Sequence, residues 1–215
     1  MIFNILEKRR LKKKESPAPL IGSKIHQILF YNEIFSKIKS QNLNGDIVEC
    51  GVGWGRSAIL LSEISEIYNL NKKIFLCDTY SGFPELSQKD KEIFGIYKGY
   101  YNVPISSLKK YFSNSKISTI KNIEYLVGDI KITMKDFNSE ICLLNLDLDI
   151  HSSYKFALEQ IVKNVVKGGV IIIDEYNSKK WSNIKSLVNE YLDNKNFKFF
   201  KSSYPLFNRV YFVKN

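Results

Sequence analysis

The sequence has no apolar stretch near the roughly 20 residues that a helix needs to cross a bilayer. Its start also lacks an apolar run followed by the small residues of a signal-peptide cleavage site. We therefore expect a cytoplasmic protein. Cysteines are few, and Cys50, Cys77 and Cys142 form no CxxC pair. Their wide spacing argues against a zinc site or a disulfide, so we expect buried free thiols in a reducing compartment.

Positive charge is in excess, with a formal net charge of +10 that is concentrated in EKRRLKKK over residues 7–14. This run could contact an anionic membrane surface or nucleic acid, or it could be a solvated terminus. No stacking aromatics are interleaved with the charges, which disfavours a nucleic-acid partner. The prolines of SPAP at 16–19 should break any helix. We predict a basic arm over residues 1–19, which need not be ordered, and a single domain over 20–215.

From Leu20 onwards, continuous apolar strands alternate with amphipathic helices, which predicts an α/β fold with a mostly parallel sheet covered on both faces. The chain closes with two strands that have no helix between them, so we expect an antiparallel hairpin at one edge of a seven-stranded sheet. The predicted helices are 20–40, 56–69, 105–113, 152–166 and 181–193, and the predicted strands are 46–50, 73–78, 123–129, 141–147, 169–174, 197–200 and 209–213.

The turn after the first strand carries three alternating glycines, in ECGVGWGRS. Missing side chains at such a turn let the backbone approach a ligand, and the N–H groups of the next helix point at it. The spacing differs from the dinucleotide fingerprint G-x-G-x-x-G. It resembles motif I of class I S-adenosylmethionine-dependent methyltransferases, and the alternative is a tight turn with no ligand. The resemblance implies that Glu49 helps to hold the ammonium group of the cofactor and that Gly51, Gly53, Gly55 and Ser57 contribute to its site.

Two further strand ends carry carboxylates that suit a nucleotide. Asp78 ends the second strand, where an acceptor can take both ribose hydroxyls of a nucleotide bound over the first turn. Thr79 follows it. Gly128 and Asp129 end the third strand, near the adenine position of the family that motif I suggests. Asp78 could equally be a cap or turn residue, and Gly-Asp is also a common turn dipeptide.

Acidic pairs follow the fourth and fifth strands: Asp147 and Asp149 in LLNLDLDIHSSY, and Asp174 and Glu175 in GGVIIIDEYNS. If these strands are neighbours, the four carboxylates converge at the edge that holds the cofactor pocket. Like charges would repel one another there unless a cation were present. Oxygen ligands without cysteine favour Mg²⁺. The alternative is that these acids cap helices or lie solvated on loops.

Together, VECGVGWG, DTYSGFPE and LNLDLDIHSSY…GGVIIIDEY resemble the macrocin O-methyltransferase family, the sugar-hydroxyl methyltransferases of tylosin and mycinamicin biosynthesis. The resemblance runs from about Gly45 to Asp193. It implies a Rossmann-like class I fold and Mg²⁺-dependent methyl transfer to a sugar hydroxyl. The metal ligands would be Asp147 or Asp149 together with Asp174 and Glu175. The sequence departs from the family at His151, where a tyrosine is expected, and at Glu175, where the family usually has aspartate.

Methyl transfer to a sugar hydroxyl needs an aligned acceptor and a base. Asp147 or Asp149 could be that base, and His151 competes because its unperturbed pKa lies near neutral pH. The aromatic segment from Thr79 to Pro104 is long enough to be a lid that selects a sugar or glycoside acceptor. The aromatic residues of this segment could instead form a contact in a homo-oligomer. The competing functions are a metal-independent small-molecule methyltransferase, a nucleic-acid methyltransferase, and a non-catalytic cofactor-binding protein.

Overall fold

The computed structural model describes residues 17–114, 122–193 and 196–215, with their side chains from Lys24 onwards except that of Asn114. The basic segment 7–14 lies outside these ranges. The first described element is helix α2, Pro17–Ser40. The expectation that SPAP breaks any helix is wrong, because Pro17 and Pro19 both lie in the first described turn of α2. Proline is tolerated in the first turn of a helix, where backbone N–H groups have no partner in the helix.

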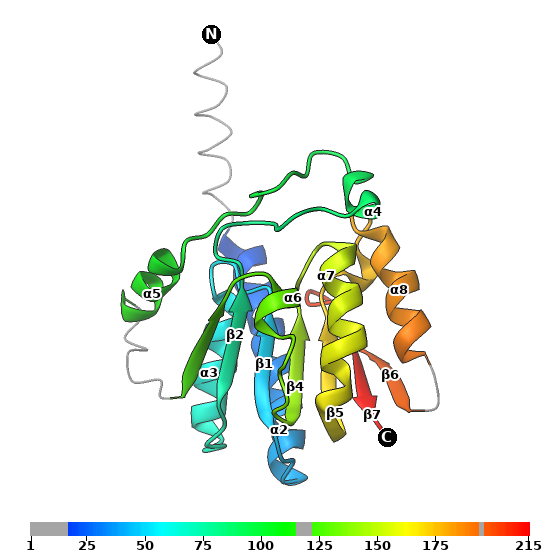
Figure 1. Cartoon of the computed structure of the whole chain (residues 1–215). Helices are drawn as coiled ribbons and strands as arrows, with labels where there is room; N and C mark the ends of the chain where they lie inside the picture. Colours follow the sequence, from blue (N-terminus) through cyan, green and yellow to red (C-terminus); the bar gives the residue numbers. More distant parts are fainter. Residues whose placement is uncertain (1–16, 115–121, 194–195) are drawn as a thin grey trace.

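Within the described ranges, the strands form one seven-stranded sheet in the order β3-β2-β1-β4-β5-β7-β6 (Figure 1). The strands β1 to β5 are parallel, and β7 is antiparallel to both β5 and β6. The predicted doubly wound sheet with a C-terminal hairpin is thus confirmed. The strands are β1 Asp46–Cys50, β2 Ile74–Asp78, β3 Ile123–Val127, β4 Ile141–Leu146, β5 Val165–Ile173, β6 Phe197–Lys201 and β7 Val210–Lys214.

Helices cover both faces of the sheet (Figure 1). Apolar side chains of α2, α3 and α5 pack on one face in a core with Ile47 and Ile172. Those of α6, α7 and α8 pack on the other face with Val48 and Ile171. The helices are α3 Arg56–Ile67, α4 Gln88–Lys91, α5 Ile105–Asn114, α6 Ile130–Thr133, α7 His151–Phe156 and α8 Ser182–Leu192, and α7 continues as a π turn over Ala157–Ile161 and a 3-10 turn over Val162–Asn164.

Strand β1 lies between β2 and β4, so the carboxyl ends of these three parallel strands meet at the middle of one sheet edge. In a doubly wound sheet, ligands bind at this switch in strand order. The segment between β2 and α5 crosses this edge and contains α4 (Figure 1). The fold therefore brings the predicted lid over the predicted cofactor turn.

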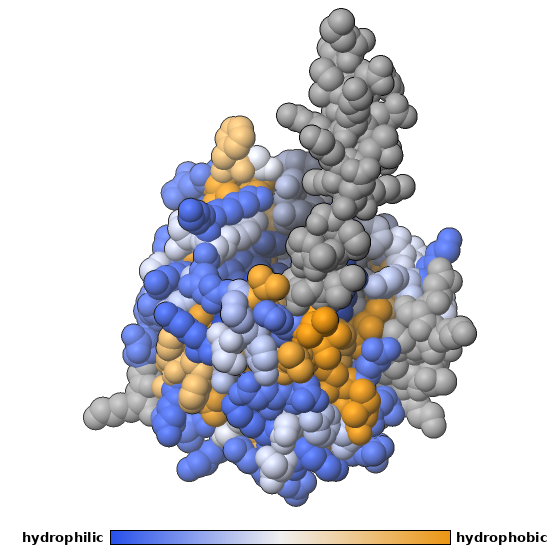
Figure 2. All heavy atoms as spheres, turned by 180° about the vertical axis from the view of Figure 1, so that it is seen from behind, coloured by the Kyte–Doolittle hydropathy of each residue, from blue (hydrophilic) through white to orange (hydrophobic). Residues whose placement is uncertain are grey.

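Helix α2 is unevenly buried. Ile34, Phe35 and Ile38 belong to the core, whereas Ile25 and Ile28 are exposed. Seen from behind, the molecule has separate apolar groups on a mostly hydrophilic surface (Figure 2). A homo-oligomer stays a prediction, and this helix offers apolar surface for it. None of the described helices combines the length and the apolar character needed to span a membrane.

Candidate active site

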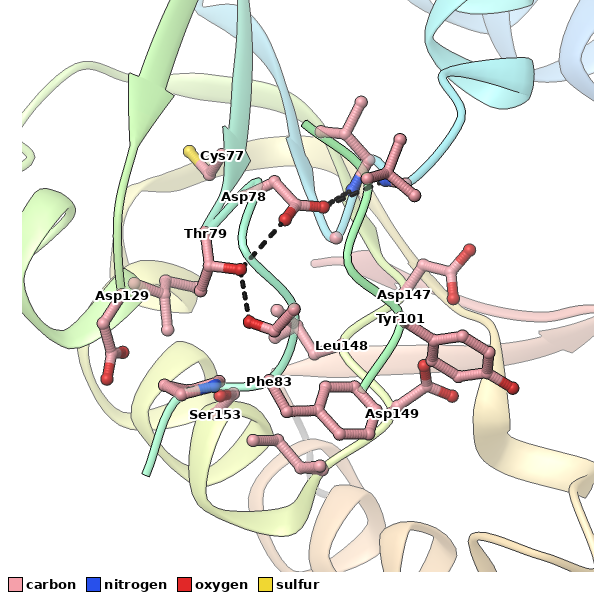
Figure 3. A pocket seen from close by; sticks show the side chains of 18 of the residues that line it. Cys77, Asp78, Thr79, Phe83, Tyr101, Asp129, Asp147, Leu148, Asp149 and Ser153 are labelled. Carbon is pink, nitrogen blue, oxygen red and sulfur yellow. Dashed lines mark hydrogen bonds between the residues drawn. The ribbon is translucent and has the colours of Figure 1, made fainter. Parts of the chain in front are cut away.

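A cavity of about 360 Å³ opens over the glycine turn at the carboxyl ends of β1, β2 and β4. Figure 3 places Asp129 on one side of it and Asp147, Asp149 and Tyr101 on the other, with Asp78 between them. The volume lies in the range of small-molecule sites. Of the sequence-predicted site residues, those that line the cavity are Gly51, Gly53, Ser57, Asp78, Thr79, Gly128, Asp129, Asp147 and Asp149.

The three glycines of the turn serve different contacts. A Cβ on Gly51 would lie 1.7 Å from the backbone oxygen of Asp147, so Gly51 allows the end of β4 to approach β1. A Cβ on Gly55 would lie 2.2 Å from Cδ1 of Leu108, so this glycine makes room for α5. Only Gly53 of the three has open space, with no atom of the described chain within 4 Å of its Cβ position. Gly53 is therefore the position that leaves room for a ligand.

Asp78 shapes the turn from the neighbouring strand. Its Oδ2 accepts hydrogen bonds from the backbone N–H groups of Val52 (2.8 Å) and Gly53 (2.9 Å). Its Oδ1 accepts from the N–H of Tyr80 at 2.8 Å. The Thr79 hydroxyl also lies 3.4 Å from Oδ1, but its one proton makes the shorter bond of 2.5 Å to the backbone oxygen of Gly82. A lone pair of Oδ1 therefore remains for a ligand. Asp129 likewise lines the cavity and caps α6, accepting from the N–H of Lys131 at 3.0 Å.

Glu49 lies fully buried beneath the cavity and does not line it. Its Oε1 accepts hydrogen bonds from the hydroxyl of Ser57 at 2.5 Å and from Nδ2 of Asn145 at 2.8 Å. Its Oε2 is buried without a hydrogen-bond partner among the described residues. Burial raises the pKa of Glu49 to about 8, although the two hydrogen bonds oppose this shift. Beneath the turn there is thus a buried oxygen to which no described residue offers a cation or a donor.

An acidic cluster is formed by Asp147, Asp174 and Glu175, each of which has one carboxylate oxygen within 4.8 Å of the other two. Asp149 is outside this group. Burial, followed by repulsion from Asp147, raises the pKa of Asp174 to about 7. Burial also raises the pKa of Asp147 to about 6. Burial is the main cause of both shifts, and repulsion between neighbouring carboxylates adds to it.

Two residues outside the predicted site hold this cluster. Arg209 forms an ion pair with Asp174. The Tyr154 hydroxyl lies within hydrogen-bonding distance of both Glu175 and the backbone oxygen of Leu146 (2.8 Å), and it can donate its one proton to either of them. Tyr154 is on α7 and fully buried. The side chain of Glu175, which is longer than the aspartate usual in the family, is therefore held in place by a buried residue of α7. Nothing in the local sequence around either residue marks this role, because both reach the cluster through tertiary packing.

Asp149 lines the cavity beside an aromatic wall. Its backbone has a left-handed φ of 61°, which turns the chain after β4. Burial, followed by the charge of Asp174, raises the pKa of Asp149 to about 7, whereas Lys180 opposes the shift. The wall contains Phe83, Tyr100 and Tyr101, with ring centroids of Phe83 and Tyr101 5.5 Å apart. Sequence reasoning missed Lys180, whose ammonium lies 5.1 Å from the Tyr100 ring centroid.

His151 is buried and does not line the cavity. Its backbone N–H donates to Oδ1 of Asp90 at 2.6 Å, which ties the start of α7 to α4. Asp90 also accepts from the N–H of Ser87 at 3.1 Å in a capping box. Burial lowers the pKa of the His151 imidazole. We therefore propose a structural role for His151 in place of the catalytic one that the sequence suggested.

The sheet order and the cavity after its central strands define a class I, Rossmann-like methyltransferase fold. The solved structure of the O-methyltransferase NovP superposes with a TM-score of 0.75, at 19% identity over 89% of this chain and 80% of NovP. The calicheamicin methyltransferase CalS11 gives a TM-score of 0.74, at 22% identity over 96% of this chain and 90% of CalS11. These likenesses confirm the predicted fold.

The sequence profile of the family "Macrocin-O-methyltransferase (TylF)" matches residues 7–199, so the chain belongs to that family. It is also 25% identical, over 146 residues, to the 8-demethyl-8-(2,3-dimethoxy-alpha-L-rhamnosyl)-tetracenomycin-C 4'-O-methyltransferase of Streptomyces olivaceus. That match covers 65% of this chain and 56% of the relative. The chain spans just over half the length of the curated relatives it matches. The family predicted from the sequence is confirmed.

Proposed function

We propose that the protein is an O-methyltransferase that moves a methyl group from S-adenosylmethionine to a hydroxyl of a sugar or similar polyhydroxylated small molecule. Membership of the macrocin O-methyltransferase family supports this activity. The observation that carries the proposal is that Asp147 both lines the cavity over the glycine turn and belongs to the acidic cluster. One crevice therefore combines a cofactor site with a cation site.

The cavity suits a ligand with positive charge. Among its described lining residues, the carboxyl and basic side chains are those of four aspartates and one arginine, Arg56. S-adenosylmethionine supplies the methyl group as a sulfonium and also carries an ammonium and a carboxylate. We place its adenosine between Asp78 and Asp129 and its amino-acid end over Gly53. The buried Oε2 of Glu49 beneath this turn, which has no partner in the described part of the chain, fits an ammonium, directly or through water.

The acidic cluster fits a hard divalent cation, because its three side chains offer carboxylate oxygens and no softer ligand. Mg²⁺ bound by Asp147, Asp174 and Glu175 would orient the acceptor hydroxyl and lower its pKa. Asp149 would then remove the proton, since it lines the cavity outside the cluster and its pKa is raised to about 7. We thus assign Asp147 as a ligand and Asp149 as the base.

The aromatic wall supports a sugar acceptor. Phe83, Tyr100 and Tyr101 come from the segment that crosses the sheet edge, and Tyr101 is 56% exposed. Aromatic faces pack against the apolar faces of sugar rings, while the nearby carboxylates accept from hydroxyl groups. A cytoplasmic setting stays part of this proposal, and the three buried free cysteines fit a reducing compartment.

The test is methyl transfer from labelled cofactor to nucleotide sugars and polysaccharide fragments, with and without Mg²⁺. Asp174→Asn should reduce turnover at least 100-fold, because a ligand charge is lost. Cofactor affinity should stay within about tenfold, or about 1.4 kcal/mol. The control is Asp136→Asn, an exposed aspartate outside the cavity and the cluster.

Near-normal turnover of Asp174→Asn would refute the metal assignment. Activity that survives EDTA would favour a metal-independent methyltransferase. Cofactor binding without turnover on any acceptor would favour a non-catalytic protein.

A further inference from the structure

Arg209 is held at the edge of the acidic cluster by its backbone. It directly precedes β7 in the loop that joins β6 and β7. Its N–H donates to the backbone oxygen of Phe207 at 2.9 Å, and its own backbone oxygen accepts from the N–H of Ser202 at 2.8 Å. The side chain extends from this fixed point to Asp174. The loop therefore aims the guanidinium at one carboxylate of the cluster.

The guanidinium is the cation that already compensates this cluster. In the part of the chain that the structure describes, no other lysine or arginine forms an ion pair with Asp147, Asp174 or Glu175. Its charge opposes the rise in the pKa of both Asp147 and Asp174. One positive charge faces three carboxylates, so the compensation is incomplete. The cluster can hold a further cation only if it also accommodates this arginine.

The Arg209 side chain has a second contact that it can keep when it leaves Asp174. Its side chain is 30% exposed, and its guanidinium carbon lies 4.9 Å from the centroid of the Phe207 ring. Guanidinium groups stack favourably on aromatic faces and are less strongly hydrated than ammonium groups. The side chain can thus release Asp174 while it stays on the ring. Release of one carboxylate oxygen is what a divalent cation needs in order to bind Asp174.

We propose that Arg209 competes with the divalent cation for Asp174. The arginine pairs with Asp174 in the metal-free protein and releases it when the metal binds. The inference rests on the metal site of the proposed function. The metal must displace the guanidinium from this carboxylate, so the arginine lowers the affinity for metal. In return it pairs with one carboxylate of the metal-free cluster. Arg209 thereby sets the metal concentration at which the site fills.

The test is equilibrium binding of Mn²⁺ to the full chain, followed by the electron paramagnetic resonance signal of the free ion, together with thermal unfolding in EDTA. Arg209→Gln should bind Mn²⁺ at least fivefold more tightly than the wild type and unfold at a lower temperature in EDTA. The matched control is Lys201→Gln on the same hairpin, whose ammonium lies 6.0 Å from the Phe199 ring centroid. It should leave both quantities unchanged.

Equal or weaker Mn²⁺ binding by Arg209→Gln than by the wild type would overturn the proposal. It would also be overturned if neither of these two proteins bound Mn²⁺. If this variant does not fold, Arg209→Lys replaces it, because an ammonium pairs less firmly with a carboxylate at a planar site. It should bind Mn²⁺ at least twofold more tightly, and equal or weaker affinity would again overturn the inference. If the Arg209 variant binds Mn²⁺ more tightly as expected but no methyl transfer is detected, the proposed function is refuted and the inference about Arg209 stands.

Discussion

Glu49→Gln tests whether burial keeps the carboxyl group beneath the cofactor turn neutral. The substitution keeps the shape of the side chain and an oxygen that can accept from Ser57 and Asn145. It removes the ability to ionise. The wild-type carboxyl is fully buried, and one of its oxygens has no partner among the described residues. Any cost of placing a negative charge at this point is therefore absent from the variant.

The magnitude follows from linkage. Burial raises the pKa of Glu49 from 4.5 to about 8, so the folded protein retains a proton that the unfolded chain releases. Its contribution to the free energy of unfolding therefore falls as pH rises through this window, by up to about 5 kcal/mol. The aspartates of the crevice contribute to the pH dependence too. The difference between the wild type and Glu49→Gln isolates the contribution of Glu49.

The assay is urea denaturation of both proteins without cofactor from pH 5 to pH 9. The stability of Glu49→Gln relative to the wild type should increase with pH and level off above about pH 8. Glu63→Gln, an exposed glutamate on α3, is the control and should run parallel to the wild type. Parallel curves for the wild type and Glu49→Gln would refute the argument that burial holds this carboxyl neutral.

The remaining predictions concern the turn and the lid. Gly51→Ala should destabilise the fold by about 3 kcal/mol or more in urea denaturation, because its Cβ would meet the backbone of Asp147. Gly53→Ala should cost only about 1–2 kcal/mol of backbone strain but weaken S-adenosylmethionine binding at least tenfold by calorimetry; undiminished binding would contradict the site. Asp90→Ala should cost about 2–3 kcal/mol by leaving the N–H groups of Ser87 and His151 unpaired, and a loss below 0.5 kcal/mol, within about the error of the measurement, would count against this link.

Much of the fold follows from the sequence because buried parallel strands are continuous apolar runs. The first strand is predicted at its observed bounds, 46–50. The fifth was predicted from 169 but begins at Val165, where a register shift lets it pair with Ile141. Apolar periodicity does not report such shifts. The proline segment misled for a related reason, since proline breaks a helix in its interior but is compatible with its first turn.

The site is predictable to the extent that it lies at strand ends. Strand order alone brings Asp78, Asp147 and Asp149 to one crevice. Arg209 and Tyr154 reach the cluster from a hairpin loop and from a helix, so their roles depend on packing that no local pattern encodes. Asn145 did leave a signal, because it is a lone amide inside the apolar run LLNLD. Buried amides need partners, and this one donates to Glu49.

The central claim is that the glycine turn and the acidic cluster serve one reaction in one crevice. A crystal structure with S-adenosylhomocysteine and Mn²⁺, with the metal located by anomalous scattering, tests this directly. We expect the nucleoside between Asp78 and Asp129 and the Mn²⁺ on Asp147, Asp174 and Glu175, with both ligands facing the same cavity. Mn²⁺ bound elsewhere, or cofactor bound away from Gly53, would contradict the account.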